Sequence, residues 1–140
     1  MREIDALRMR LSAAESLPHT LAASWDTFEL VLAVADAYAD EAPDMFAAFM
    51  FAAAAAAEGR DTVGFAPSMP DSPGEPTPRA GTSRHNVGEI ADELAGLMTA
   101  IGHRLETAAS RAHNPSDRQA CEQGARQAIR IRSLLTPGQP

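Results

Sequence analysis

The sequence predicts an all-α protein, a bundle of about five helices with a proline-rich extended strap between the third and the fourth helix. Apolar residues recur at helical spacing in long segments, and no segment shows the convincing alternation of a β-strand. Prolines, glycines and an Asn-Pro sequence separate these segments. With 140 residues and 45% apolar content, the chain is long enough for one core without disulfides or metals. We therefore expect a single helical domain over residues 1–140.

The first two helices are predicted from their apolar faces. The first covers residues 2–16, and Pro18 then ends or redirects it. The second covers residues 20–41 and has a broad apolar face that includes Trp25 and Phe28. Acidic residues lie on the opposite sector of this helix, so we interpret them as solvated surface charges. These acids are Asp26, Glu29, Asp36 and Asp40.

The third helix, expected over residues 43–63, is apolar on every side along most of its length. All 13 residues from Met45 to Ala57 are apolar, so this segment has no polar face to turn towards water. Such a helix is either buried at the centre of the bundle or exposes a Phe/Met surface that needs a partner. Pro43 fits the first turn of this helix and equally fits a kink in one long helix, and the sequence leaves both open.

A proline-rich connector is expected over residues 64–84. Prolines at every third position fit an extended polyproline helix, which we expect to pack across the bundle as a strap; a stiff linker is the alternative. The fourth helix is predicted over residues 85–112 from a near-heptad apolar stripe. The fifth is predicted over residues 116–135 from a stripe of small residues. The regularly spaced prolines are Pro67, Pro70, Pro73 and Pro76.

Charge and composition argue against several classes of partner and compartment. The net charge is −7, and residues 1–66 hold 11 acids against 4 arginines, so neither nucleic acid nor an anionic membrane is expected as a partner. One cysteine allows no intramolecular disulfide, and a cytoplasmic location is expected. The longest apolar run falls short of the roughly 20 residues that a membrane-spanning helix needs.

Candidate chemistry is sparse, and no catalytic residue, metal site or cofactor is predicted. Phosphate-binding loops, dinucleotide fingerprints and nucleophile elbows do not occur in the sequence. The single cysteine, Cys121, falls on the apolar stripe of the last helix, where a thiol is normally inert. His85, Glu89 and Glu93 follow one another at four-residue spacing, which we interpret as a charged helix face rather than as metal ligands.

His103 and Arg132 are the two polar residues of most interest. The run from His103 to Ala109 resembles the phosphoacceptor motif of histidine phosphotransfer domains, which are four-helix bundles. That motif reads His-x-Leu-Lys-Gly, whereas Glu106 and Thr107 stand here in place of the lysine and glycine, and an acid there repels a phosphoryl group. Arg132 lies within the apolar stripe of the last helix, which indicates either an anionic partner or a long side chain that reaches solvent.

These observations favour a non-catalytic protein that acts by association. We expect it to form a homodimer, or to bind a protein partner, through an apolar helix surface. One alternative is a binder of a small apolar molecule, held by the same side chains in the bundle core. Another is an enzyme or a histidine phosphotransfer protein that uses an exposed His103. The side chains expected to form the apolar partner or ligand surface are Trp25, Phe28, Phe46, Phe49 and Met50.

Overall fold

The fold is all-α, as predicted. The structure, a computed structural model, describes residues 2–71 and 86–136, and within these ranges it contains five α-helices, two short 3₁₀ turns and no β-strand. The α-helices are α1 (Arg2–Ala13), α2 (Leu17–Tyr38), α3 (Phe46–Gly64), α4 (Val87–Arg111) and α5 (Pro115–Leu135), and the 3₁₀ turns are η1 (Ala39–Glu41) and η2 (Pro43–Met45).

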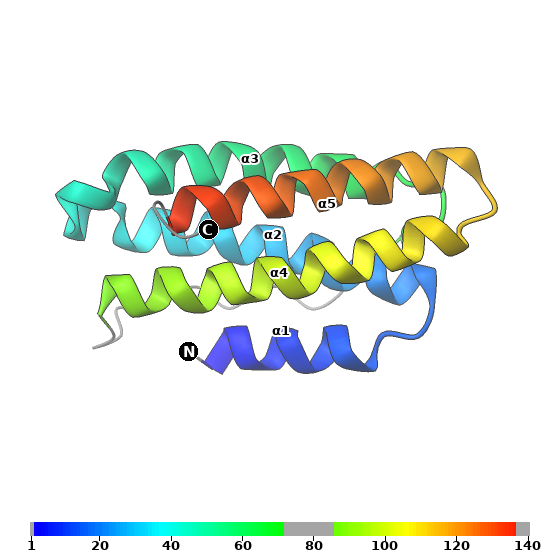
Figure 1. The fold of residues 1–140 in the computed structure, drawn as a ribbon, viewed down its shortest axis with the longest axis horizontal. Helices are drawn as coiled ribbons and strands as arrows, with labels where there is room; N and C mark the ends of the chain where they lie inside the picture. Colours follow the sequence, from blue (N-terminus) through cyan, green and yellow to red (C-terminus); the bar gives the residue numbers. More distant parts are fainter. Residues whose placement is uncertain (1, 72–85, 137–140) are drawn as a thin grey trace.

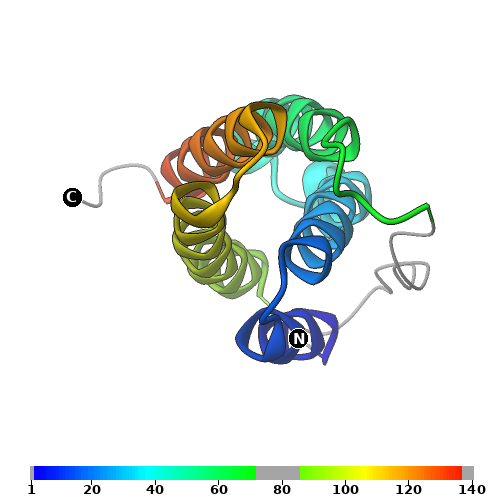
Figure 2. The same ribbon diagram turned by 90° about the vertical axis from the view of Figure 1, so that its right-hand side faces the viewer.

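Four of the helices form a ring around one core (Figures 1 and 2). In this ring α2 packs against α3 and α4, and α5 packs against α3 and α4. Helix α1 lies outside the ring, against α2 and α4. No helix occupies the centre, so of the two alternatives for the third helix, burial on every side is wrong. In a ring of four, each helix turns one face to the core and leaves another outside.

The direction of the helices explains why a long connector is needed. Helices α2 and α3 are antiparallel, whereas α3 and α4 run in the same direction (Figure 1). The chain must therefore return along the whole bundle between α3 and α4, a length of roughly 37 Å for a helix of 25 residues. Most of the expected strap, including Pro73 and Pro76, lies outside the described residues, so its course is not tested.

The first residues of the connector do pack on the bundle. Ala66 is buried and Met69 lies against the core. The side chain of Asp117, in the first turn of α5, accepts two hydrogen bonds from Ser68, one from its backbone N–H (2.9 Å) and one from its hydroxyl (2.6 Å). This buried carboxylate ties the start of the connector to α5.

The break between the first two helices differs from the prediction. Helix α1 ends at residue 13 rather than 16, and α2 begins at residue 17 rather than 20. The side chain of Ser16 caps α2 by accepting a hydrogen bond from the backbone N–H of His19 (3.3 Å). Pro18 follows in the first turn, where a missing N–H costs nothing. Pro18 therefore helps to start α2 instead of ending α1.

Pro43 marks a turn and not a kink. Helix α2 ends at Tyr38, earlier than the predicted residue 41, and the turns η1 and η2 then reverse the chain. Pro43 is the first residue of η2, and α3 follows from residue 46 to residue 64, against a predicted range of 43–63. The two open interpretations of this proline are thereby resolved in favour of a separate third helix.

The last two helices begin at asparagine caps. Asn86 accepts a hydrogen bond from the N–H of Gly88 (2.7 Å), so α4 begins at residue 87 and not at 85. Asn114 accepts one from the N–H of Ser116 (2.8 Å), so α5 begins at Pro115, one residue before the predicted start. Helix α4 ends at residue 111 and α5 at residue 135, within one residue of the predictions.

Glycines allow close contacts between the helices at two points. A Cβ atom added at Gly59 would lie 2.7 Å from Cζ of Phe28, so the buried ring of α2 packs directly on the α3 backbone. A Cβ atom added at Gly124 would lie 2.9 Å from Cγ1 of Val63, which brings α5 equally close to α3. Atoms this close cannot both be accommodated without a shift in a packed core.

Asp26 corrects the interpretation of the acids on α2. It is buried, and its carboxylate accepts a hydrogen bond from Arg10 on α1 (2.6 Å). Burial raises the pKa of Asp26, and the Arg10 contact opposes that shift only partly. Asp36 and Asp40 are exposed as expected. Asp26 differs because α1 covers its side of the ring, which a helical wheel of α2 alone does not reveal.

Candidate functional site

The five side chains expected to form one apolar surface are divided between the core and the surface. Phe28 and Phe49 are 0% and 1% exposed, so they pack inside the bundle. Trp25 is half-buried and lies close to Gly64 at the end of α3. Phe46 and Met50, by contrast, are 45% and 50% exposed. The structure therefore does not bring the five together on one face.

A continuous apolar surface does exist on the outward side of α3. Phe51 belongs to it and is 58% exposed, more than Phe46 or Met50. Residues four apart lie on neighbouring turns of a helix, so the exposed side chains form two adjacent rows. We call this surface the α3 apolar face, and it consists of Phe46, Ala47, Met50, Phe51 and Ala54.

Phe51 was not predicted as a surface residue. Every position from Met45 to Ala57 is apolar, so the hydrophobic pattern gives no direction to the helix. Only the packing partners of α3 decide which side faces outward. The one available signal was spacing: Ala47 and Phe51 are four residues apart, as are Phe46 and Met50. This spacing places each pair on one side of the helix, but it does not show which side faces outward.

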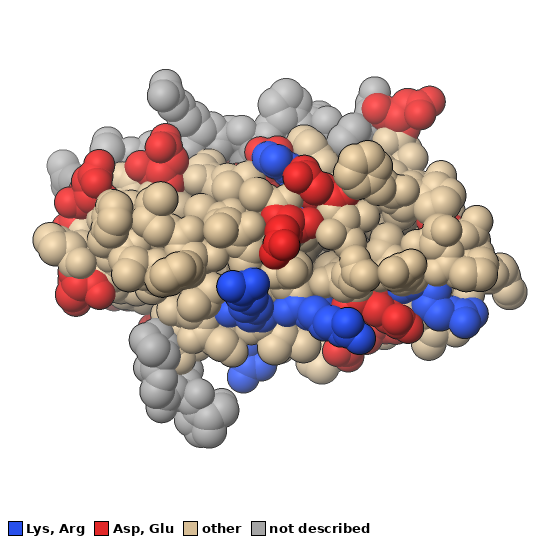
Figure 3. Space-filling view, turned by 90° about the horizontal axis from the view of Figure 1, so that it is seen from above, with Lys and Arg blue, Asp and Glu red and all other residues tan. Residues whose placement is uncertain are grey.

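Charged residues border the α3 apolar face at both ends. Figure 3 shows a largely uncharged surface with acidic groups at its left end and near its centre, and a row of basic groups along one side with acidic groups beside it. At the N-terminal end lie the exposed acids Asp40, Glu41 and Asp44. At the other end Arg130 of α5 approaches Glu58 of α3, with 3.9 Å between Nη1 and Oε2. The exposed Arg126 precedes Arg130 by one turn of α5.

The polar residues around the C-terminal half of α3 form structural contacts. Arg60 donates hydrogen bonds to Glu29 of α2 (3.1 Å) and to its neighbour Asp61 (3.2 Å). The first of these joins α2 to α3 across a half-buried surface. Arg60 and Asp61 are thus engaged with each other.

His103 and Arg132 do come together. Both are exposed, and with Glu106 they line a depression of about 100 Å³ between α4 and α5. Pockets for organic ligands usually measure about 300–1,000 Å³, so this depression is small for a substrate. Arg132 reaches solvent from its place near the apolar stripe, and Glu106 supplies a negative charge beside the histidine.

Cys121 offers no nucleophile. Its thiol is buried in the first half of α5, and this burial, with smaller contributions from the charges of Asp117 and Glu122, raises the pKa to about 11. Across the described ranges, no three His, Cys, Asp or Glu side chains are grouped so as to hold a metal ion. His85, part of the charged pattern His85–Glu89–Glu93, lies outside the described residues.

The comparisons add no family to this description. Comparisons with protein families, with curated proteins and with solved structures find no match to this chain. In the part of the chain that the structure describes, no helix combines the length and the apolar character that crossing a bilayer requires.

Proposed function

We propose that this protein is non-catalytic and acts by association, with the α3 apolar face as the contact surface of a homodimer. The observation that supports this most directly is the exposure of Phe46, Met50 and Phe51 on successive turns of one helix. Large apolar side chains gathered in this way are a frequent mark of protein interfaces, because covering them removes apolar area from water. Aromatic residues and methionine are also enriched at interfaces.

The charges around the face favour a second copy as the partner. A twofold axis through the face exchanges its two ends. It thereby brings the acidic end of one copy, Asp40 to Asp44, towards Arg126 and Arg130 of the other. Opposite charges at the rim of an interface favour correct orientation and faster association. The alanines Ala47 and Ala54 leave room for the two helices to approach closely.

The proposed setting is the cytoplasm, with neither nucleic acid nor a membrane as the partner. The lone buried thiol of Cys121 is compatible with a reducing compartment. The net charge of −7 disfavours a polyanionic partner. A different protein partner at the α3 apolar face remains as an outcome of the test below.

The test is the oligomeric state of two matched variants. Met50→Lys places a charge in the middle of the α3 apolar face, whereas Met9→Lys places the same charge at an exposed site on α1 (73% exposed). We expect sedimentation equilibrium over a roughly hundredfold range of concentration to show a dimer for the wild type and for Met9→Lys, because mass action favours association as concentration rises. We expect Met50→Lys to remain monomeric.

A wild-type protein that stays monomeric over this range would exclude the homodimer. A dimer that Met50→Lys leaves unchanged would place the interface elsewhere on the molecule. If the wild type is monomeric but binds a defined second protein, with binding lost only in Met50→Lys, the face would be an interface for a partner of another kind.

A further inference from the structure

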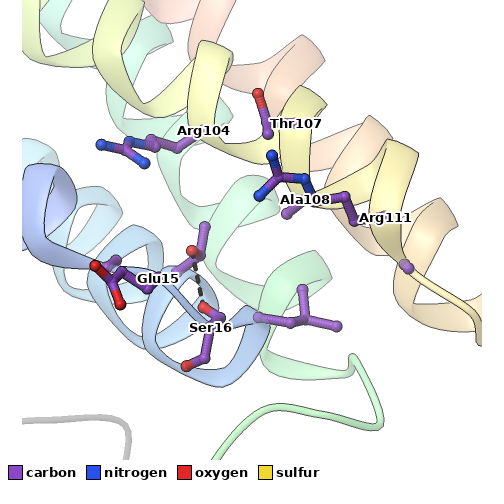
Figure 4. A pocket seen from close by; sticks show the side chains of 10 residues that line it. Glu15, Ser16, Arg104, Thr107, Ala108 and Arg111 are labelled. Carbon is purple, nitrogen blue, oxygen red and sulfur yellow. Dashed lines mark hydrogen bonds between the residues drawn. The ribbon is translucent and has the colours of Figure 1, made fainter.

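A pocket that the proposed homodimer does not use lies at the opposite side of the ring. It has a volume of about 480 Å³ and lies between the turn that joins α1 to α2 and the C-terminal half of α4 (Figure 4). This volume is within the range of about 300–1,000 Å³ typical of small-molecule sites. The lining residues are Ala14, Glu15, Ser16, Leu17, Thr20, Arg104, Thr107, Ala108, Arg111 and Ala112.

Two arginines give the pocket a positive wall. Arg104 and Arg111 are seven residues apart, or about two turns, so they project from the same side of α4. Figure 4 shows both guanidinium groups on the α4 side, with Glu15 and Ser16 across the gap. Arg104 donates one hydrogen bond, to the backbone carbonyl of Ser12 (3.1 Å), which holds it over the turn. A guanidinium carries five N–H donors, so most of them remain available.

Arg111 has no ion-pair partner among the residues that the structure describes. Within residues 2–71 and 86–136, neither Arg104 nor Arg111 forms an ion pair with a carboxylate. Two uncompensated cations on one wall of a pocket attract an anion, and the planar fork of arginine matches a carboxylate in a bidentate arrangement.

The rest of the pocket is suited to a short apolar body. Ala14 and Ala112 are buried, and Leu17 and Ala108 are half-buried, so the floor of the pocket is aliphatic. The hydroxyl of Thr20 donates to the carbonyl of Ser16 (3.0 Å) and is therefore already satisfied. Glu15 lies on the rim, where its negative charge opposes a ligand with more than one anionic charge.

We propose that this pocket binds a small amphipathic monocarboxylate. Its carboxylate would accept hydrogen bonds from Arg111 and Arg104, and its aliphatic chain would lie on Leu17 and the alanines. Glu15 disfavours a phosphate dianion, which carries a second negative charge.

The test uses the full chain and four probes: sodium hexanoate, sodium acetate, hexylammonium chloride and sodium phosphate. In ¹H–¹⁵N correlation spectra at low salt, hexanoate is expected to shift the backbone amides of Leu17, Thr107 and Arg111. Acetate is expected to shift them less, since it lacks the chain, and hexylammonium is expected to leave them unchanged. Low salt matters because Arg111 is exposed and its charge is screened at high ionic strength.

Two arginine variants give the matched comparison. Arg111→Gln is expected to weaken hexanoate binding about tenfold, the usual effect of losing a charge-assisted hydrogen bond. Arg2→Gln removes an exposed arginine from the start of α1, outside the pocket, and is expected to leave the Kd unchanged. Because Arg111 makes no contact that the fold requires, loss of folding is not expected in this variant.

Three results would overturn the inference. The site would be excluded if hexanoate did not shift the amide signals of the pocket residues. It would also be excluded if Arg111→Gln and the wild type had equal Kd values for hexanoate. Tighter binding of inorganic phosphate than of hexanoate would exclude a monocarboxylate as the ligand class. This test does not depend on the homodimer. Residue 50 lies on α3, away from the pocket, so the Met50→Lys variant is expected to bind hexanoate like the wild type.

Discussion

Helices α3 and α4 both belong to the ring, and α1 covers part of α4 only. The two helices divide their side chains differently between core and solvent. Helix α4 buries most of its apolar stripe, and residues such as Glu106 face outward. Helix α3 buries Phe49 on its inner side and leaves Phe46, Met50 and Phe51 outside. Both helices contribute one face to the core, so the apolar excess of α3 lies beyond what the bundle requires.

This difference shows that the side of the helix on which a residue lies, and not its hydrophobicity alone, decides whether it is buried. In α4 the pattern and the position agree, so an apolar residue on the stripe is a core residue. In α3 the same kind of residue is core or surface depending only on its direction. The packing of the monomer therefore does not explain the exposed apolar side chains of α3. Their exposure motivates the proposed interface.

The largest expected effect comes from two phenylalanines on α3 that differ only in direction. Phe49→Ala is expected to lower the free energy of unfolding by about 3–5 kcal/mol, because it opens a cavity in the core. Phe51→Ala is expected to change it by about 0.5 kcal/mol or less, since this ring is exposed. Urea denaturation of both variants, at protein concentrations low enough to keep the wild type monomeric, measures the difference. Similar losses in the two variants would contradict the orientation of α3.

A second pair compares a glycine on the inner side of α3 with one on the outer side of α4. Gly59→Ala is expected to cost about 1–3 kcal/mol of unfolding free energy, because the new methyl group meets the buried ring of Phe28. Gly96→Ala is expected to stabilise by about 0.5–1 kcal/mol through helix propensity. Its Cβ would lie 3.3 Å from the exposed, flexible side chain of Arg8. Thermal denaturation of the two variants tests this, and a stabilising Gly59→Ala would contradict the close packing.

The smallest expected effect concerns Asp26, which is buried where α1 covers the ring. Its folded-state pKa lies above the ordinary value of 3.8, so the folded protein holds this proton more firmly than the unfolded chain does. Its contribution to stability is therefore greatest below pH 3.8 and is lost as the pH rises through the folded pKa. Asparagine at this position cannot titrate. As the pH rises from 3.8 through the folded pKa of Asp26, the unfolding free energy of Asp26→Asn is therefore expected to rise relative to that of the wild type.

Urea denaturation at several pH values, from below the ordinary pKa to neutrality, measures this change. Asp36→Asn, which removes an exposed carboxylate from the same helix, corrects for the loss of net charge. If the unfolding free energy of the wild type instead rises relative to that of Asp26→Asn as the pH rises, the ion pair with Arg10 outweighs the cost of burial.

Much of the local structure was predictable. The five helices follow from apolar spacing and from prolines, and half of their ends were predicted to within one residue. The cap at Ser16 was missed, because Pro18 was interpreted as a stop signal although proline also suits the first turn of a helix. The apolar surface was predicted in part: Phe46 and Met50 lie on it, but Phe28 and Phe49 lie in the core and Phe51 was overlooked.

By itself, the sequence determined that the protein is all-α, that α4 and α5 each have one side suited to a core, and that α3 carries more apolar surface than one interior face can hold. These properties depend on local spacing and composition, which act within a few turns of helix. The tertiary structure alone decided which side of α3 faces outward, that α1 buries Asp26, and that Arg104 and Arg111 face the α1–α2 turn across a pocket. These depend on contacts between residues far apart in the chain, which no local pattern encodes.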